Sequence, residues 1–518
     1  MGFLLLCLLC GKAQAQHLSP TLAKQRIAEP QLRLVYESDA LYAFDSPRGF
    51  YLSATDATQP AILGYSDEGS FEQAKRNPTF SLLVSLMERN LRVRRNTNTI
   101  VPHVRPSGVK DEVPPMLPSL FHQYKPFNDS CPIVDGDTCV TGCVANAMAE
   151  VMNYHQWPIQ GKGSYPNFDS LGCKQSLTAD FASHRYDWSN ICNDYEAGYT
   201  PKQAAAVATL LSDCGISLNM RYGVETSATS MVSQPIALTR YFGYDEGMQI
   251  YFRNFFTQIE WDSLMFTELS EGRPLMAGGW SPDSGHSFTV DGYDHNGLFH
   301  CCFGNPQGDG NAWLNYTFLS PDQPLWHDPL SPETGMNLLQ TLLVGVKPKR
   351  TSEPSPQTHI YGFSHIAYLG SQPDGTHRIA VYHLGNIGWN EHTGRVGIML
   401  MENSKHKSQL AEVNASDLLY TYDHPFPLEE ITDSTFSDTL TIRLPQQLPN
   451  GLYRIVPVFE EPDGHFVEAR TMVGTPNYLQ CSVNDANVSI SIPQHDTAKL
   501  RITDIQFPDT IEAKIGRA

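Results

Sequence analysis

The apolar residues of the stretch from Asp137 to Pro158 recur three and four positions apart. The apolar positions that follow Gly142 are Val144, Ala147, Met148, Val151 and Met152. The positions between them include the polar residues Asn146, Glu150 and Asn153. This spacing predicts an amphipathic helix with one buried side, beginning at Cys143.

Cys143 lies in the first turn of this predicted helix. Unpaired backbone N–H groups and the positive end of the helix dipole favour a thiolate over a thiol there. The position therefore suits a nucleophilic cysteine, although filling space as a small apolar residue is the commoner role of a cysteine. The presence or absence of a catalytic partner for this cysteine elsewhere in the chain decides between these two interpretations.

Further along the chain, helical segments give way to strand-like ones. Thr200, Pro201 and Gln203 predict a capped helix start, and this helix is expected to stop at Gly215. Another helix is expected around residues 261–270. Strand-like runs follow at residues 275–279, 286–293, 298–303 and 313–318. Helices followed by antiparallel strands predict an α+β domain.

Two further modules flank this domain. Residues 32–71 alternate strand-like runs with turns, and residues 80–95 predict a helix that ends in a basic stretch. The polar residues after it are expected to form a linker open to cleavage. Near the C-terminus, strand-like runs predict an immunoglobulin-like β-sandwich, and fold analogy suggests contact with a cell surface, glycans or the secretion machinery. We divide the chain into residues 1–15 (signal peptide), 16–113 (first module), 114–348 (α+β domain), 349–357 (linker), 358–498 (sandwich) and 499–518 (start of an incomplete further β domain).

The chain has 518 residues and a formal net charge of -19. Such acidity argues against nucleic acid or an anionic membrane surface as the main partner. A short apolar segment, residues 3–10, precedes Ala13-Gln14-Ala15, which predicts a secretory signal cleaved after Ala15. No later apolar run reaches the length of a transmembrane helix, so the mature protein is expected to be secreted or held at a cell surface by other means.

Export makes disulfides chemically accessible, and the sequence holds 11 cysteines. Cys7 and Cys10 lie in the predicted signal peptide. The odd number that remains fits one free thiol beside disulfide pairs, whose pairing the spacing leaves open. The remaining cysteines form no C-x-x-C motif and the chain has no H-E-x-x-H motif, so no metal site and no cofactor are predicted.

His286 is the candidate partner of Cys143. It opens a predicted strand, at a separation from the cysteine within the roughly 130–150 residues seen in papain-type enzymes. An imidazole there can hold the thiolate as an ion pair and later protonate a leaving amine. His155, His295 and His300, at a helix end, a turn and mid-strand, suit structural roles better.

Several phrases occur in order between residues 35 and 348: AILGYSDEGSF, QYKPFNDSCP, TGCVANAMAEVMNYHQWP, LLSDCGISLNMRYG, GHSFTVDGYD and LLVGVKP. Together they resemble the streptopain family of secreted bacterial cysteine peptidases, relatives of papain in fold. The resemblance implies Cys143 as nucleophile and His286 as general base and acid. Gln123 matches the family's glutamine, which with the Cys143 backbone N–H forms an oxyanion hole. It also implies protein or peptide substrates and makes residues 16–113 an inhibitory prodomain.

The chain departs from the family pattern after His300. Family members read H-x-N-W-G-W-G-G, in which the asparagine orients the imidazole and the tryptophan shields it. Here Cys302 and Phe303 occupy those two positions. Because a cysteine is a poor acceptor for an imidazole N–H, Asn305 is the candidate to orient the imidazole instead.

These observations favour a secreted cysteine endopeptidase made as a zymogen. The alternative is a catalytically weakened relative that serves as a surface binding protein or adhesin. A transglutaminase-like acyl transferase would share the cysteine and histidine, but that class would want an Asp after the histidine and the phrases point to peptidases. We favour the peptidase because Cys143, His286 and Gln123 are all retained.

Overall fold

We describe a computed structural model of the chain, in three modules. The described residues are 17–97, 105–170, 173–280, 285–306, 310–315, 338–351, 359–390, 394–402, 418–421, 438–473, 475–485 and 487–493. The predicted signal peptide and the predicted further β domain lie outside these residues, as does most of the predicted linker at 349–357. In the described part, no helix has the length and apolar character needed to cross a membrane.

The N-terminal module, residues 17–97, combines a small sheet with three helices. Its elements are α1 (Pro20–Ile27), β1 (Arg33–Glu37), β2 (Leu41–Asp45), β3 (Phe50–Ala54), β4 (Gly64–Ser66), α2 (Phe71–Lys75) and α3 (Pro78–Thr97). Helix α3 covers the helix predicted at 80–95.

The central module, residues 105–351, places most of its helices before its main strands. The first half contains β5 (Ile133–Val134), β6 (Asp137–Thr138), α4 (Cys143–His155), β7 (Tyr165–Ser170), β8 (Gln175–Ala179), η1 (Phe181–Ser183), η2 (Trp188–Asn190), α5 (Pro201–Ser217) and α6 (Ser233–Phe242). The second half contains β9 (Gln249–Phe252), η3 (Arg253–Phe255), α7 (Gln258–Ser270), β10 (Leu275–Trp280), β11 (Gly285–Tyr293), β12 (Phe299–Cys302), β13 (Ala312–Leu314) and β14 (Leu338–Val344). This order agrees with the predicted α+β arrangement.

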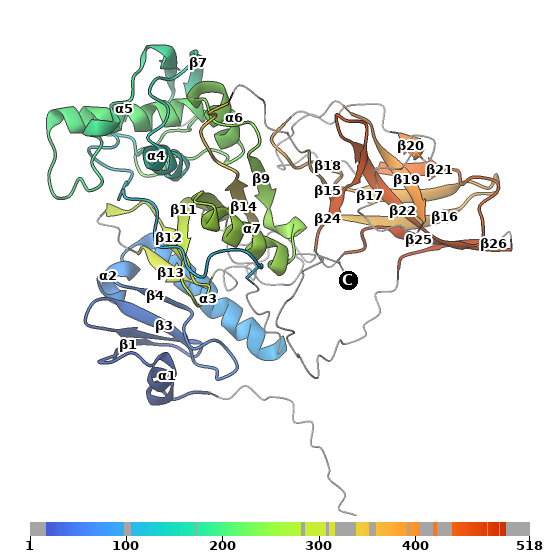
Figure 1. Cartoon of the computed structure of the whole chain (residues 1–518), viewed down its shortest axis with the longest axis horizontal. Helices are drawn as coiled ribbons and strands as arrows, with labels where there is room; N and C mark the ends of the chain where they lie inside the picture. Colours follow the sequence, from blue (N-terminus) through green and yellow to red (C-terminus); the bar gives the residue numbers. More distant parts are fainter. Residues whose placement is uncertain are drawn as a thin grey trace, which may run out of the picture.

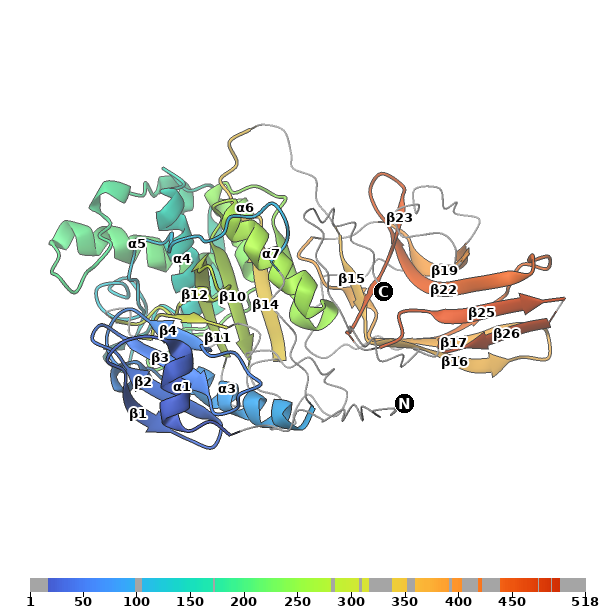
Figure 2. The ribbon, with the colours of Figure 1, turned by 60° about the horizontal axis from the view of Figure 1, so that its bottom comes forward.

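One antiparallel sheet runs through both of these modules (Figures 1 and 2). Its 10 strands follow the order β1-β2-β3-β4-β13-β12-β11-β10-β14-β9. The two modules join where β4 pairs with β13, with Tyr65 opposite Trp313 and Gly64 opposite Leu314. The Tyr65 and Trp313 rings stack there, with centroids 5.9 Å apart. The sequence did not predict this continuous sheet.

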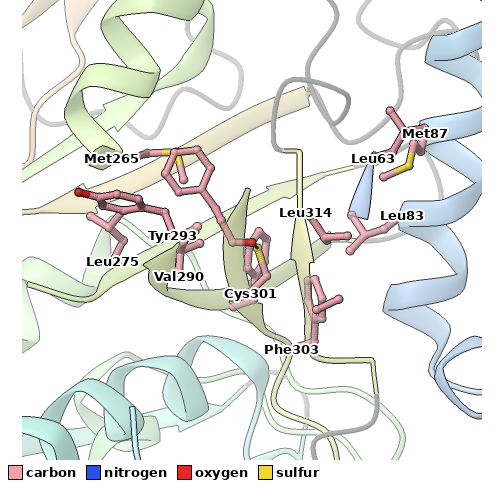
Figure 3. Close-up of a cluster of buried hydrophobic side chains, with 14 of the residues drawn as sticks. Leu63, Leu83, Met87, Met265, Leu275, Val290, Tyr293, Cys301, Phe303 and Leu314 are labelled. Carbon is pink, nitrogen blue, oxygen red and sulfur yellow. Dashed lines mark hydrogen bonds between the residues drawn. The ribbon is translucent and has the colours of Figure 1, made fainter. Parts of the chain in front are cut away.

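The N-terminal and central modules also share a hydrophobic core (Figure 3). Leu63 before β4 and Leu83 and Met87 on α3 belong to the same buried cluster as Phe303 and Leu314 of the central module. Burial of apolar surface contributes about 25 cal/mol of stabilising free energy per Å², so the shared core holds the two modules together.

The helix predicted from Cys143 forms as α4, although the prediction of a single buried side was wrong. Asn146, Glu150 and Asn153 are buried together with the apolar residues. The reason is that α4 lies centrally, packed against β10 and β11 and also against α5. Buried polar side chains need hydrogen-bond partners, and the Asn146 side chain accordingly donates to the Phe121 carbonyl at 3.3 Å.

Helix α5 begins as predicted, with Thr200 and Gln203 forming a capping box. It does not stop at Gly215 but continues to Ser217. The glycine is required by packing: a Cβ at position 215 would lie 2.0 Å from the Tyr222 hydroxyl oxygen. Gly215 therefore allows a close approach inside the helix and does not end it.

The C-terminal module, residues 359–493, consists of strands. They are β15 (Tyr361–Phe363), β16 (His365–Ser371), β17 (His377–Tyr382), β18 (Gly385–Asn386), β19 (Val396–Glu402), β20 (Leu418–Thr421), β21 (Asp438–Ile442), β22 (Gly451–Glu460), β23 (Phe466–Glu468), β24 (Arg470–Thr471), β25 (Leu479–Asn484) and β26 (Asn487–Ser491). Sheet β16-β17-β21 and sheet β20-β19-β22-β25-β26 contribute to one buried cluster.

The C-terminal module is docked on the central one, on the side away from α5 in both views (Figures 1 and 2). The buried Trp389 donates its indole N–H to the Met248 carbonyl at 2.7 Å. Nearby, the Val473 backbone N–H donates to the Asn254 carbonyl at 2.8 Å. These contacts fix the module beside β9 and η3.

Candidate active site

Cys143 and His286 come from the two halves of the central module. Cys143 is the first residue of α4, and His286 is the second residue of β11, paired with Gly279 of β10. Because α4 packs against both of these strands, the fold brings the thiol and the imidazole together. The two side chains form a hydrogen bond and are only partly buried.

The backbone before Cys143 depends on a glycine. Gly142 has φ 88° and ψ 136°, in the region that side chains rarely adopt. A Cβ there would also lie 2.7 Å from the Met220 sulfur. Gly142 thus turns the chain so that the cysteine opens the helix.

The pKa values of the pair are shifted in opposite directions. Burial alone would raise the pKa of the Cys143 thiol, but the charge and hydrogen bond of His286 together lower it below its ordinary value. Burial alone would lower the pKa of His286, but the Cys143 thiolate and the hydrogen bonds of the imidazole raise it. This arrangement stabilises a thiolate–imidazolium ion pair.

Backbone N–H groups add to the stabilisation of the thiolate. The Ser287 N–H donates to the Cys143 sulfur at 3.4 Å, and the Val144 N–H lowers the pKa of the thiol through a further hydrogen bond. The second of these comes from the first turn of α4, where helix N–H groups lack partners within the helix. The location of Cys143 at the helix start therefore supports the charge that the sequence predicted there.

The imidazole of His286 is oriented by a main-chain carbonyl. Its Nε2 lies 3.0 Å from the Phe303 carbonyl oxygen. The Asn305 side-chain amide donates to the same oxygen at 3.2 Å. On the other side of this residue, the Phe303 N–H donates to the Asn311 side-chain oxygen at 2.9 Å. Asn305 thus contacts the same Phe303 carbonyl oxygen that contacts the imidazole of His286.

Gln123 lies in the loop that leads to the cysteine. Its carbonyl accepts a hydrogen bond from the Thr141 N–H at 3.3 Å, which ties this loop to the residues just before Cys143. The residue is half-buried. The structure therefore places Gln123 on a segment attached to the start of α4.

Cys302 takes part in a separate polar cluster. Its sulfur lies 3.8 Å from Asp291 Oδ1 and 3.7 Å from His300 Nδ1. The carbonyl oxygen of the next residue, Phe303, is the group within hydrogen-bond distance of the His286 imidazole. Sequence motifs did not indicate this contact, because a main-chain acceptor leaves no signal in the residue types.

A cysteine–histidine pair at the junction of a helix and an antiparallel sheet is typical of cysteine peptidases of papain-like fold. A sequence model of the Peptidase C10 family matches residues 121–314. Residues 121–314 thus carry the domain of this family, that of streptopain, as the sequence phrases indicated. The predicted papain-like α+β domain is thereby confirmed.

Three relatives show the extent of the similarity. The thiol protease/hemagglutinin PrtT of Porphyromonas gingivalis is 27% identical over 336 residues, which cover 61% of this chain and 38% of PrtT. Streptopain of Streptococcus pyogenes is 27% identical over 331 residues, which cover 60% of this chain and 81% of streptopain. The structure of a fragment of prointerpain A of Prevotella intermedia matches with a TM-score of 0.55 and 29% identity, covering 62% of this chain and 99% of the fragment.

Proposed function

We propose that this chain is a cysteine endopeptidase made as a zymogen. The observation that carries the proposal is the pair of opposed pKa shifts, a lowered pKa for Cys143 and a raised pKa for His286. A group that only fills space needs no such pairing, whereas a nucleophilic thiolate and a proton donor at neutral pH require it.

In the proposed reaction, the Cys143 thiolate attacks the carbonyl carbon of the scissile peptide bond. The negative charge that develops on the carbonyl oxygen is met by the Cys143 N–H and by the side chain of Gln123. The His286 imidazolium gives its proton to the leaving amine as the C–N bond breaks, which leaves a thioester on Cys143. A water molecule, deprotonated by His286, then attacks the thioester and releases the acid product.

The N-terminal module is the proposed inhibitory prodomain. It shares a sheet and a hydrophobic core with the central module. It also packs on the loop after β12: a Cβ at Gly310 would lie 2.7 Å from the Asn77 side-chain nitrogen and 3.0 Å from the Phe80 Cβ. The neighbouring Asn311 holds the Phe303 main chain that orients His286. These contacts support an influence of the module on the catalytic imidazole.

Removal of the prodomain requires a cut in the segment from Arg92 to Lys110. Residues 98–104 of this segment lie outside the described residues. From Arg105 onward the chain is attached to the central module, since the Arg105 side chain donates to the His295 carbonyl at 2.9 Å and Val113 pairs with Tyr293. A cut before Arg105 would therefore release the prodomain without disturbing these contacts.

The C-terminal module is the proposed immunoglobulin-like sandwich. The two sheets that share one core support this assignment. Export through the signal peptide predicted at residues 1–15 would make the whole protein a secreted or surface-held bacterial peptidase.

Casein cleavage by purified precursor tests the proposed function. Wild-type protein is expected to lose about a hundred residues on standing and to become active, whereas the Cys143→Ala variant should stay full-length and inactive. Cys192→Ala is the matched control, because Cys192 is also partly exposed but has a pKa raised by burial. A wild-type chain without activity would favour the binding-protein alternative, and undiminished activity in Cys143→Ala would disprove the nucleophile.

A further inference from the structure

Two adjacent cysteines of β12 face opposite sides of the sheet. Cys301 belongs to the buried apolar cluster that includes Phe303 (Figure 3). Cys302 has its sulfur near Asp291 and His300. Successive residues of a strand point to opposite faces, so the polar group lies on the face turned away from this core.

A β-bulge contributes Asp291 to this polar group. The register between β11 and β12 shifts between Val290 and Gly292, which leaves Asp291 as the extra residue. Its carboxylate is fully buried and is held by its second oxygen, Oδ2, which accepts a hydrogen bond from the Leu117 N–H at 2.8 Å. The first oxygen, Oδ1, lies 2.6 Å from His300 Nδ1. The carboxylate is therefore fixed, with one oxygen directed at the imidazole.

We propose that Asp291, His300 and Cys302 form a binding site for a divalent transition-metal cation, with Zn²⁺ as the preferred ion. Their three ligand atoms lie within 4.8 Å of one another. Carboxylate, imidazole and thiolate are all ligands that Zn²⁺ accepts, and thiolate selects it over Mg²⁺ and Ca²⁺. A water molecule can fill the fourth position of a tetrahedral site.

The distances between the ligand atoms suit tetrahedral coordination. Zn–S bonds of about 2.3 Å and Zn–N bonds of about 2.0–2.1 Å place the sulfur and nitrogen about 3.5 Å apart, and bonds to oxygen are similar. The sulfur of Cys302 lies 3.7 Å from His300 Nδ1 and 3.8 Å from Asp291 Oδ1. Only the Asp291–His300 pair, now hydrogen-bonded at 2.6 Å, has to separate, by roughly 0.7 Å.

The residues around this group provide an outer hydrogen bond and leave one side of it in contact with solvent. The Leu117 N–H holds Asp291 as outer-sphere partners of ligating carboxylates do. The His300 side chain retains an exposure of 16%, whereas that of Asp291 is fully buried, so the His300 ring forms the side of the group that faces solvent. Glu150 on α4 also lies near Asp291 and Cys302; its carboxyl accepts from Thr289 Oγ1 at 3.0 Å, and burial raises its pKa well above the ordinary value.

Metal binding would exchange a proton for the cation. Burial, followed by the Asp291 and Glu150 carboxylates, raises the pKa of the Cys302 thiol well above its ordinary value, so this thiol is protonated without metal. Coordination releases the proton of the Cys302 sulfur to solvent, while His300 coordinates through Nδ1 as the neutral tautomer that carries its proton on Nε2. No electron is transferred in this step.

The site lies within the strands that carry the catalytic histidine. Cys302 pairs with Thr289, three residues after His286, and precedes the Phe303 carbonyl that orients the imidazole. A bound cation would therefore fasten β11 to β12 beside the active site. The ligand order Asp291, His300, Cys302 matches neither C-x-x-C nor H-E-x-x-H, so sequence motifs do not indicate this site.

Co²⁺ titration of the full chain tests the proposal, in a Cys143→Ala background that removes the active-site thiolate. One equivalent of Co²⁺ is expected to give a thiolate-to-cobalt absorption band in the near ultraviolet, and Zn²⁺ should displace it. Adding Cys302→Ala should abolish the band and weaken Zn²⁺ binding by at least about tenfold. The matched control is Cys301→Ala, the adjacent cysteine on the apolar face.

A second variant keeps the test decisive if Cys302→Ala unfolds. His300→Gln alters a partly exposed position and should weaken Co²⁺ and Zn²⁺ binding likewise, while its melting temperature without metal stays near that of its parent. With metal, the parent should gain thermal stability and His300→Gln should not. A thiolate–cobalt band that persists in Cys302→Ala, or a parent that binds neither cation, would overturn the proposal.

Discussion

Replacing Asn305 with alanine is expected to reduce kcat/KM only modestly. Asn305 donates to the Phe303 carbonyl at 3.2 Å, and the same oxygen keeps its contact with His286 Nε2 at 3.0 Å after the substitution. One neutral hydrogen bond contributes about 0.5–1.5 kcal/mol net, which corresponds to about a 2- to 12-fold change in rate. The loss should fall at the lower end, because no buried group is left without a partner.

The control is Asn311→Ala, which acts on the same main chain from the other side. The Asn311 side chain accepts the Phe303 N–H at 2.9 Å, so its removal leaves a donor unsatisfied at a cost of about 1–3 kcal/mol. Asn311→Ala should therefore lower both the melting temperature and kcat/KM more than Asn305→Ala does. The assay is hydrolysis of a fluorogenic peptide by matured enzyme, with active sites counted by thiol titration.

A large effect of Asn305→Ala would refute this account of the imidazole. Removing the orienting residue of a serine peptidase triad costs about 10⁴-fold in kcat. If Asn305→Ala lost more than about a thousandfold while Asn311→Ala lost little, the Asn305 side chain itself would have to orient His286 in the working enzyme.

Three further results are expected. The pH profile of kcat/KM should be bell-shaped. The Cys143 thiolate is lost as pH falls through its lowered pKa, and the His286 imidazolium is lost as pH rises through its raised pKa. A profile with a single rising limb near pH 8.5 would contradict the ion pair. Gly142→Ala should lower the melting temperature and the activity, because the φ of 88° at this position and the nearby Met220 sulfur exclude a Cβ. The expected loss of folding free energy is about 1–3 kcal/mol. An unchanged melting curve would show that the turn does not require a glycine. Trp389→Ala should make the C-terminal module separable by limited proteolysis, since the substitution removes a buried ring and its hydrogen bond to the Met248 carbonyl. Cleavage as slow as in wild type would show that other contacts are enough to hold the module on the central one.

The sequence predicted the elements that carry the site because local patterns determine them. The helix at Cys143 follows from apolar spacing, the start of α5 from its capping box, and β11 from the apolar run around His286. The roles of Cys143 and His286 came from their positions at a helix start and a strand start and then from the family resemblance, whereas the role of Gln123 came from the resemblance alone; all three remain predictions for experiment. The papain-like α+β domain is confirmed.

The remaining features depend on contacts between distant segments. The pairing of Tyr65 with Trp313 joins two modules, and no local pattern indicates which strand edges will meet. The burial of Glu150 reflects the packing of α4 on both sides, which helical periodicity cannot reveal. The contact of His286 with the Phe303 carbonyl is invisible in the sequence because every residue has a carbonyl.

The rate of alkylation of each thiol at about pH 6 tests the central claim, a Cys143 thiolate held by His286, most directly. Full-length precursor would be treated with limiting iodoacetamide, and each cysteine-containing peptide would be quantified by mass spectrometry. Cys143 should react much faster than Cys192, a partly exposed thiol whose pKa is raised by burial and by Asp194. His286→Ala should abolish this advantage. If Cys143 reacts no faster than Cys192 in the wild-type chain, the thiolate–imidazolium pair does not exist.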